Sequence, residues 1–265
     1  MAILGGVGAA LDLLQRADAA AALPRLGGMA RPDGVVIVSE RFWAFAGRDG
    51  SLREGEMPKL PALIQRIPLA RGLLRLGLSL APLLRRRGVA GRKERPFLLV
   101  VLLAPFGLVF LPEAVRLPVG LGATLLLAAW LLRGRTLRLH GAEHRAIAAV
   151  EERSLIDTWE GRARPSRFSP RCGTNFAALA LPITWISERA WPLAPELWTP
   201  IAVTAVSLAV TMELWRAVQI RKALKPLLLP GLALQRLTTR EPALEETRVA
   251  LRATASVLAR ELASA

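Results

Sequence analysis

Four apolar runs constrain the fold of this chain more than any other feature of its sequence. They cover residues 97–111, 117–132, 176–186 and 197–215. A helix needs about 20 apolar residues to cross a bilayer, so each run is short for a span. A content of 52% hydrophobic residues and a mean hydropathy of +0.36 nevertheless point to a membrane protein. A thin bilayer, or extension into the flanking residues, would let all four runs cross, and a helical hairpin that enters from one side is the alternative for the first two.

Positive charge gathers at the ends of these runs. The net charge is +15, carried mostly by arginine. Basic clusters at residues 85–95, 133–138 and 216–222 border apolar segments, as cytoplasmic loop ends and contacts with anionic lipids do. The sequence therefore predicts four crossings with both termini in the cytoplasm, and membrane lipids rather than nucleic acid as partners. The single cysteine excludes an internal disulfide and fits a reducing compartment, and residues 1–16 show no signal peptide.

The remaining segments complete the predicted fold class. This is a mainly α, polytopic membrane protein with about four transmembrane helices, amphipathic interfacial helices and a small N-terminal β-meander. Leucines at helical spacing over residues 58–87 predict a helix that lies in the membrane interface or packs against the spans. A last helix is expected from near Pro242, capped by Thr238 or Thr239. The predicted divisions are 1–57, 58–95, 96–224 with the polar segment 133–172, and 225–265.

The polar segment contains both histidines of the chain, in His140–Gly–Ala–Glu143–His144. Positions four residues apart lie on the same face of a helix, so the two imidazoles would point the same way. This H-x-x-E-H pattern is that of inverted zincins, in which two histidines hold a metal ion and the glutamate polarises its water. The spacing predicts His140 and His144 as Zn²⁺ ligands and Glu143 as a catalytic residue.

The third ligand is less determined by the pattern. Cys172, in a Pro–Arg–Cys–Gly–Thr turn, is the first choice, because thiolate and imidazole suit Zn²⁺. Glu213 is an additional candidate, because a carboxylate inside an apolar run is costly and usually functional. Glu151 and Glu152 are further options. In the alternative reading, the histidines cap or solvate a helix and Cys172 is a small buried side chain; a Cys–His hydrolase is a third alternative.

Several motifs together resemble the YqhQ-like family of bacterial integral membrane proteins, which are of unknown function and often described as metal-dependent enzymes. They are the His–Gly–Ala–Glu–His stretch, the Pro–Arg–Cys–Gly–Thr turn, glycine motifs at residues 27–35 and the long motif of residues 230–242. The resemblance implies a multi-pass protein of the inner membrane with metal ligands at His140, His144 and Cys172. This chain departs from the family pattern at Ser169, where family members usually carry histidine.

Two functions follow as expectations. The first is a zinc-dependent hydrolase that acts at the cytoplasmic membrane face on a membrane peptide or a lipid-linked group. The second is a non-enzymatic membrane factor for the insertion, folding or quality control of membrane proteins, with other membrane proteins or nascent chains as partners and a structural metal site. The sequence holds no feature that decides between them.

Overall fold

The computed structural model describes the chain in two compact units. The described residues are 7–59, 61–85, 88–91, 94–107, 111–112, 114–115, 118–120, 122–123, 126, 134–194 and 196–264. Unit 1 comprises Met1–Lys59, Leu132–Cys172 and Leu232–Ala265, and unit 2 comprises Leu60–Leu131 and Gly173–Gly231. The chain therefore leaves unit 1 and returns to it twice.

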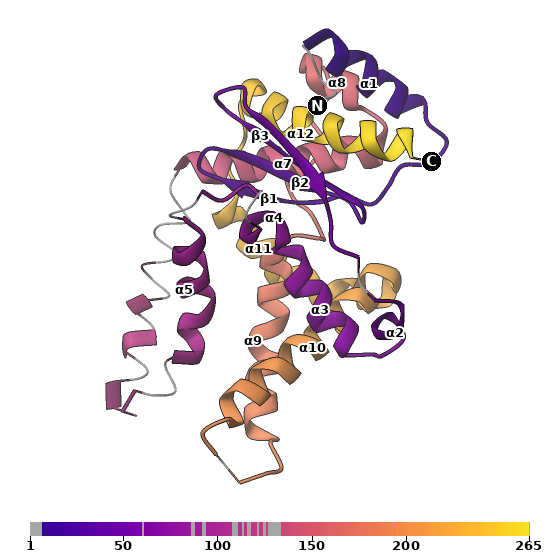
Figure 1. Cartoon of the computed structure of the whole chain (residues 1–265). Helices are drawn as coiled ribbons and strands as arrows, with labels where there is room; N and C mark the ends of the chain where they lie inside the picture. Colours follow the sequence, from indigo (N-terminus) through magenta and orange to yellow (C-terminus); the bar gives the residue numbers. More distant parts are fainter. Residues whose placement is uncertain are drawn as a thin grey trace. The chain divides into compact units, whose positions relative to one another are not determined.

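Unit 1 contains a four-stranded antiparallel meander in the segment where the sequence predicts a small sheet (Figure 1). Its strands, which pair in chain order, are β1 (Gly27–Arg31), β2 (Gly34–Val38), β3 (Phe42–Gly47) and β4 (Leu52–Glu56). The β-branched residues of β2 favour the extended backbone. Gly50, at a φ of 87°, makes the turn between β3 and β4, a conformation that side chains with a Cβ rarely adopt.

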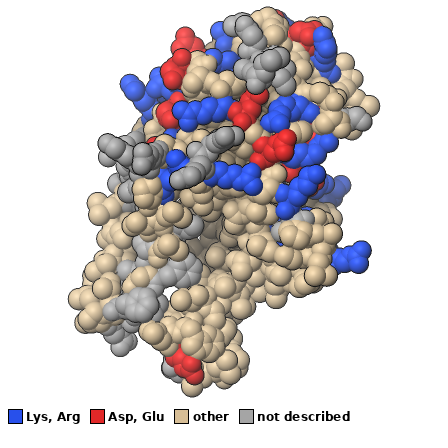
Figure 2. All heavy atoms as spheres, viewed as in Figure 1, with Lys and Arg blue, Asp and Glu red and all other residues tan. Residues whose placement is uncertain are grey.

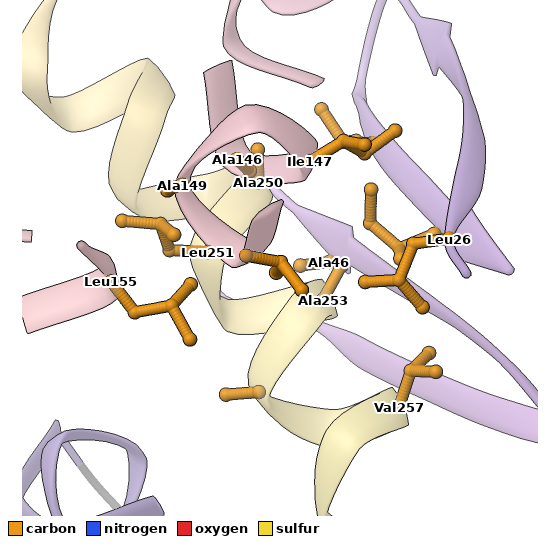
Figure 3. Packing of buried hydrophobic residues seen from close by; sticks show 14 of the residues in the cluster. Leu26, Ala46, Ala146, Ile147, Ala149, Leu155, Ala250, Leu251, Ala253 and Val257 are labelled. Carbon is orange, nitrogen blue, oxygen red and sulfur yellow. The ribbon is translucent and has the colours of Figure 1, made fainter. Parts of the chain in front are cut away.

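Helices cover this sheet and form the core of unit 1. They are α1 (Val7–Ala19), α7 (Gly134–Glu152), α8 (Leu155–Glu160) and α12 (Leu244–Ala263). α12 packs against α7, β2 and β3, while α7 also packs against β1. Figure 3 shows alanines of α7 and α12 facing one another, and such small side chains let the two helices approach closely. α7 is consequently buried along most of its length, including the histidine stretch.

Unit 2 is helical in its described residues and largely apolar at its surface. Its elements are α2 (Ala62–Gln65), α3 (Ala70–Ser79), α4 (Ala81–Leu84), α5 (Glu94–Gly107), α9 (Gly173–Arg189), α10 (Thr199–Ile220) and the 3₁₀ helix η2 (Lys222–Leu228). α11 (Leu229–Thr238) then leads back into unit 1. α10 packs against α9 and α3, and Figure 2 shows few charged side chains on the face of these helices that it draws.

The predicted four-span architecture is wrong. Among the described residues, α10 alone is long and apolar enough to cross a membrane, with 22 residues and a mean hydropathy of 1.5 in its most apolar part. α5 has 14 residues and α9 has 17, with Pro182 inside it. At 1.5 Å per residue α9 reaches about 26 Å, short of the roughly 30 Å hydrocarbon core, and the described part of α5 reaches about 21 Å. Residues 108–110 and most of the expected span 117–132 lie outside the described residues.

The amphipathic segment after Pro58 is also broken into three short helices rather than one. The break before α3 falls at Leu69, which has a φ of 67°. Gly72 lets α3 lie close to α10, because a Cβ there would come within 2.9 Å of Met212 Cβ. Arg71 of α3 forms a double ion pair with Glu213 of α10, at 2.7 Å and 2.5 Å. This pair stabilises the carboxylate that the sequence offers as an additional metal ligand.

Candidate metal centre

The two histidines lie one turn apart on α7 and face the same region of unit 1. Their ring centroids are 4.4 Å apart, with the rings inclined at 65°. Helical spacing of four residues accounts for the shared direction. The surrounding positions of α7 are alanine, glycine and other buried residues, so the imidazoles lie in a largely dry environment.

Hydrogen bonds determine which ring nitrogen of His140 carries the proton and which carries the lone pair. Its Nδ1 lies 2.8 Å from the carbonyl oxygen of Thr238, and a carbonyl can only accept, so Nδ1–H donates. In the neutral imidazole Nε2 therefore carries a lone pair, and it lies 3.2 Å from Cys172 Sγ. The thiol donates to that nitrogen. Burial lowers the pKa of His140, which keeps the ring neutral at pH 7.

His144 has the same arrangement and is more deeply buried. Its Nδ1–H donates to the carbonyl oxygen of Arg167 at 2.7 Å. Its Nε2 is buried and has no hydrogen-bond partner among the described residues, and His144 as a whole is only 1% exposed. Burial, with a smaller contribution from nearby His140, lowers the pKa of His144 to about 3. A buried neutral nitrogen without a partner is unfavourable in a protein core unless something binds to it.

Cys172 completes a group of three donors. One donor atom from each of His140, His144 and Cys172 lies within 4.8 Å of the other two, and Cys172 is 6% exposed. Zn²⁺ bound tetrahedrally by such donors needs them about 3.3–3.6 Å apart. His140 Nε2 and Cys172 Sγ, 3.2 Å apart, are already close to this spacing. Side-chain shifts of about 1 Å would bring the other pairs of donor atoms to it. The donor set and the partnerless nitrogen both fit a zinc ion.

The side chain of Gln235 holds the turn that presents Cys172. Gln235 is fully buried in α11; its Oε1 accepts from the Ser169 N–H at 2.9 Å, and its Nε2 donates to the Ser169 carbonyl at 2.7 Å. The Cys172 N–H donates to that same carbonyl at 3.4 Å. Ser169 therefore supports the cysteine turn through its backbone, and its hydroxyl accepts from the Arg171 N–H.

A second network holds the segment that carries the Arg167 carbonyl. Arg167 donates to the carbonyl and the hydroxyl of Thr239, at 2.8 Å and 2.9 Å. Arg145 of α7 donates to the Pro165 carbonyl at 3.1 Å and pairs with Glu241 at 2.6 Å. Partners of this kind orient ligating histidines and fix their tautomers in metal sites.

Gly141 is required because the chain after α11 passes directly over α7. A Cβ at Gly141 would lie 2.2 Å from the Arg240 carbonyl oxygen, which no L side chain permits. The Arg240 N–H donates to the Leu137 carbonyl at 2.9 Å and fixes this crossing. The glycine between the two histidine positions therefore lets Thr238 reach His140.

Glu143 lies on a different side of α7, against β1. A Cβ at Gly28 would come within 2.8 Å of Glu143 Cγ, and the Ala30 N–H donates to the carboxyl group. Burial raises the pKa of Glu143 to about 8, because a charged carboxylate is costly in an apolar environment. The structure gives no contact between Glu143 and the three donor side chains.

The other predicted ligands have different partners. Glu213 pairs with Arg71 within unit 2, and Arg216 lies 3.9 Å from it. Glu151 pairs with Arg171, and Glu152 is exposed. Within the described residues the group of possible ligands contains the two histidines and the cysteine without any carboxylate.

The residues that support the three donors were not predicted from the sequence. Thr238 and Arg167 contribute backbone carbonyls, which any residue could supply, so their identity carries no signal. Gln235 does give a signal in the sequence, because it is an amide in the Leu–Gln–Arg–Leu run of the long motif of residues 230–242. A buried amide on a helix generally needs a polar partner, but the sequence does not say which one.

Comparison with known proteins gives a family but no activity. The chain is 35% identical over 124 residues to the uncharacterized protein YqhQ of Bacillus subtilis (strain 168). This alignment covers 44% of this chain and 38% of the relative. The chain thus matches well under half of that relative's length. No solved structure matches it significantly. The family described as "Protein of unknown function (DUF1385)" matches residues 98–260, more than half of the chain and all three donor residues. The chain therefore belongs to the DUF1385 family.

Proposed function

We propose that this protein is a zinc-dependent hydrolase attached to the cytoplasmic face of the bacterial inner membrane. The observation that supports it is the convergence of two imidazole nitrogens and one thiol within 4.8 Å, with both histidine tautomers set by carbonyls. Three protein donors leave one tetrahedral position for water or substrate, as in catalytic zinc sites. When bound, zinc supplies a Lewis acid that polarises such a group.

Glu143 is the acid–base residue of this proposal. It directly precedes His144, and burial raises its pKa to about 8. A carboxyl group with a pKa near the working pH both accepts and donates protons efficiently. In this structure the carboxyl accepts from the Ala30 N–H on the β1 side of α7, so this role requires the side chain to turn towards the three donors.

Unit 2 supplies the attachment to the membrane. α10 contains an apolar stretch long enough to cross a membrane, and α9 exposes Leu181, Trp185 and Ile186, at 71%, 59% and 55%. Such exposed apolar surface is unfavourable in water and favourable against lipid. Basic residues precede α9 and follow α10, which favours the cytoplasmic side for these ends. The substrate class is then a membrane peptide or a lipid-linked group.

Metal analysis of the purified chain tests the site. We expect about one zinc per chain, because the three donors form one group. His144→Ala and Cys172→Ala should remove the metal, whereas Glu143→Gln should retain it. Glu152→Gln on the same helix is the matched control, because Glu152 is exposed. Wild-type protein that binds no zinc, nickel or cobalt from a metal buffer would contradict the proposal.

The hydrolase claim needs a separate test, because metal binding alone does not establish it. In a strain that lacks the gene, Glu143→Gln should fail to restore function although the protein is present and loaded with zinc. Glu152→Gln should restore it. If Glu143→Gln restores function completely, the hydrolase proposal fails while the metal site stands.

The deep burial of His144 favours a second candidate, a non-enzymatic membrane factor with a structural metal. His144 and Cys172 are almost inaccessible, and Glu143 is engaged by β1. Structural zinc sites have four protein ligands and no open position, so this candidate requires a fourth ligand beyond the three donors that the described residues bring together. Cobalt-substituted protein distinguishes the two: a spectrum that shifts when azide is added indicates an open position, and an unchanged spectrum supports the factor.

A further inference from the structure

Unit 1 contains a second site, separate from the three donors, that arginines dominate. It is a cavity of about 670 Å³ bordered by the β3–β4 turn, α7, α8 and α12. Its lining includes Arg48, Arg138, Arg248 and Arg252 beside Trp159. Figure 2 shows Lys and Arg side chains, with Asp and Glu among them, on the face of this unit that it draws. The cavity has the size of ordinary small-molecule sites, which run from about 300 to 1,000 Å³.

Two of the arginines are held in place by backbone carbonyls. Arg248 donates through Nε to the Trp159 carbonyl at 3.0 Å, and its guanidinium lies 5.7 Å from the Trp159 ring centre. Arg252 donates through Nη2 to the Gly47 carbonyl at 3.1 Å. Each guanidinium has five N–H donors, so most of them remain available. These contacts hold the side chains in position, so that little ordering is left for a ligand to impose.

The four guanidinium groups lack a neutralising carboxylate. No ion pair joins Arg48, Arg138, Arg248 or Arg252 to an acid in the described part of the chain. Arg248 and Arg252 are also four residues apart on one helix, a spacing at which like charges repel. An anion bound between these two half-buried guanidinium groups would reduce the repulsion and stabilise the fold.

The acids of the cavity do not cancel this charge. Glu246 accepts from the Ala243 N–H at 2.7 Å and serves as part of the cap of α12. Glu245 is exposed beside it. Four arginines against these two glutamates leave a net formal charge of two positive around the cavity. Since acids already occupy the end of α12, the attraction for an anion comes from the arginines.

We propose that this cavity binds a phosphate-bearing anion. Guanidinium groups match phosphate oxygens with paired N–H donors, and several of them together suit a dianion or a diphosphate better than a single carboxylate. The volume leaves room for an organic group beyond the phosphate. The same chemistry is offered by a soluble phosphate ester and by the headgroup of an anionic lipid.

Calorimetric titration of the purified protein, kept in neutral detergent for the soluble probe and detergent-free for the vesicles, tests the proposal. The soluble probe is inorganic pyrophosphate, and the lipid probe is a phosphatidylglycerol vesicle compared with a phosphatidylcholine vesicle. The double variant Arg248→Gln/Arg252→Gln removes the two tethered groups. The control double variant, Arg16→Gln/Arg236→Gln, removes the same charge at exposed positions outside the cavity.

We expect the cavity variant to weaken binding by about tenfold or more, since a charge-assisted hydrogen bond contributes at least that factor. The control variant should bind as the wild type does. Selective loss with pyrophosphate identifies a soluble ligand, and selective loss with phosphatidylglycerol vesicles alone identifies a lipid headgroup. Equal losses in both double variants indicate net charge only and overturn the proposal, as does wild-type protein that binds neither probe. An unchanged circular dichroism spectrum shows that the variants are folded.

Discussion

Replacing Gln235 by methionine should weaken zinc binding without touching a donor atom. Methionine keeps the length and volume of the side chain but cannot form the two hydrogen bonds with Ser169, of 2.9 Å and 2.7 Å. The Ser169 N–H is then left without this acceptor in a buried position. The Ser169 carbonyl keeps the weaker 3.4 Å bond from the Cys172 N–H. The turn that carries the thiol loses its main support.

The magnitude follows from these two bonds. A buried polar group left without its partner costs about 1–3 kcal/mol, so the zinc-free protein should lose about 2–4 kcal/mol of stability. A loosened support around a metal ligand typically lowers affinity by about tenfold to a hundredfold. Gln15→Met is the matched control, because Gln15 is exposed on α1 and should change neither quantity.

Two measurements separate the effects. Denaturation of the zinc-free protein, followed by tryptophan fluorescence, reports stability, and competition with a chromophoric chelator reports zinc affinity. If stability falls as expected while affinity stays within about twofold, Gln235 supports the fold but does not position Cys172. If neither quantity changes, the hydrogen bonds to Ser169 contribute nothing and the reasoning is refuted.

Three further outcomes are expected. At pH 7, zinc binding should release between one and two protons, that of the Cys172 thiol and part of that of a zinc-bound water, because both imidazoles are already neutral; calorimetry in buffers of different ionisation enthalpy measures this, and more than two protons would show a charged histidine. The zinc-free protein should lose stability as pH rises from about 4.5 towards 8, because Glu143 has a folded pKa raised to about 8 and keeps its full contribution only below its unfolded value. Melting temperatures from pH 5 to 9 should show this slope, and Glu143→Gln should flatten it; an unchanged slope would assign it to another group. Gly141→Ala should lower both the melting temperature and zinc affinity, because the new Cβ meets the Arg240 carbonyl at 2.2 Å; wild-type values would mean that the crossing segment is not fixed there.

The side chains of the candidate site are the part that local sequence spacing could predict. Two histidines four residues apart on one helix must share a face, and the structure brings their rings to 4.4 Å. Cys172 could be proposed from its chemistry, and it lies 3.2 Å from His140 Nε2. Glu213 is also a possible ligand by its chemistry, but it forms an ion pair with Arg71 of another helix. No spacing in the sequence reveals this partner.

The predicted four-span architecture failed for a related reason. Hydropathy measures how apolar a segment is, but crossing also requires length, and α9 ends after 17 residues with a proline inside it. The predicted cap of the last helix is likewise wrong: α12 begins after Ala243, and the Thr239 hydroxyl donates instead to the Gln235 carbonyl. A threonine can bond with either end of a helix, so its presence alone does not mark a start.

The candidate centre lies where the chain leaves unit 1 and where it returns. Cys172 is the last residue of its segment of unit 1, and Gln235 and Thr238 follow within a few residues of the return at Leu232. Both passages are therefore held to α7 through one small group of donors and carbonyls. A ligand that binds only the folded state stabilises it by mass action, by about 2.7 kcal/mol at a hundred times its dissociation constant. Zinc at His140, His144 and Cys172 would accordingly stabilise the segments through which unit 1 is connected to unit 2. Nε2 of His144, which has no hydrogen-bond partner among the described residues, would gain one in the zinc ion.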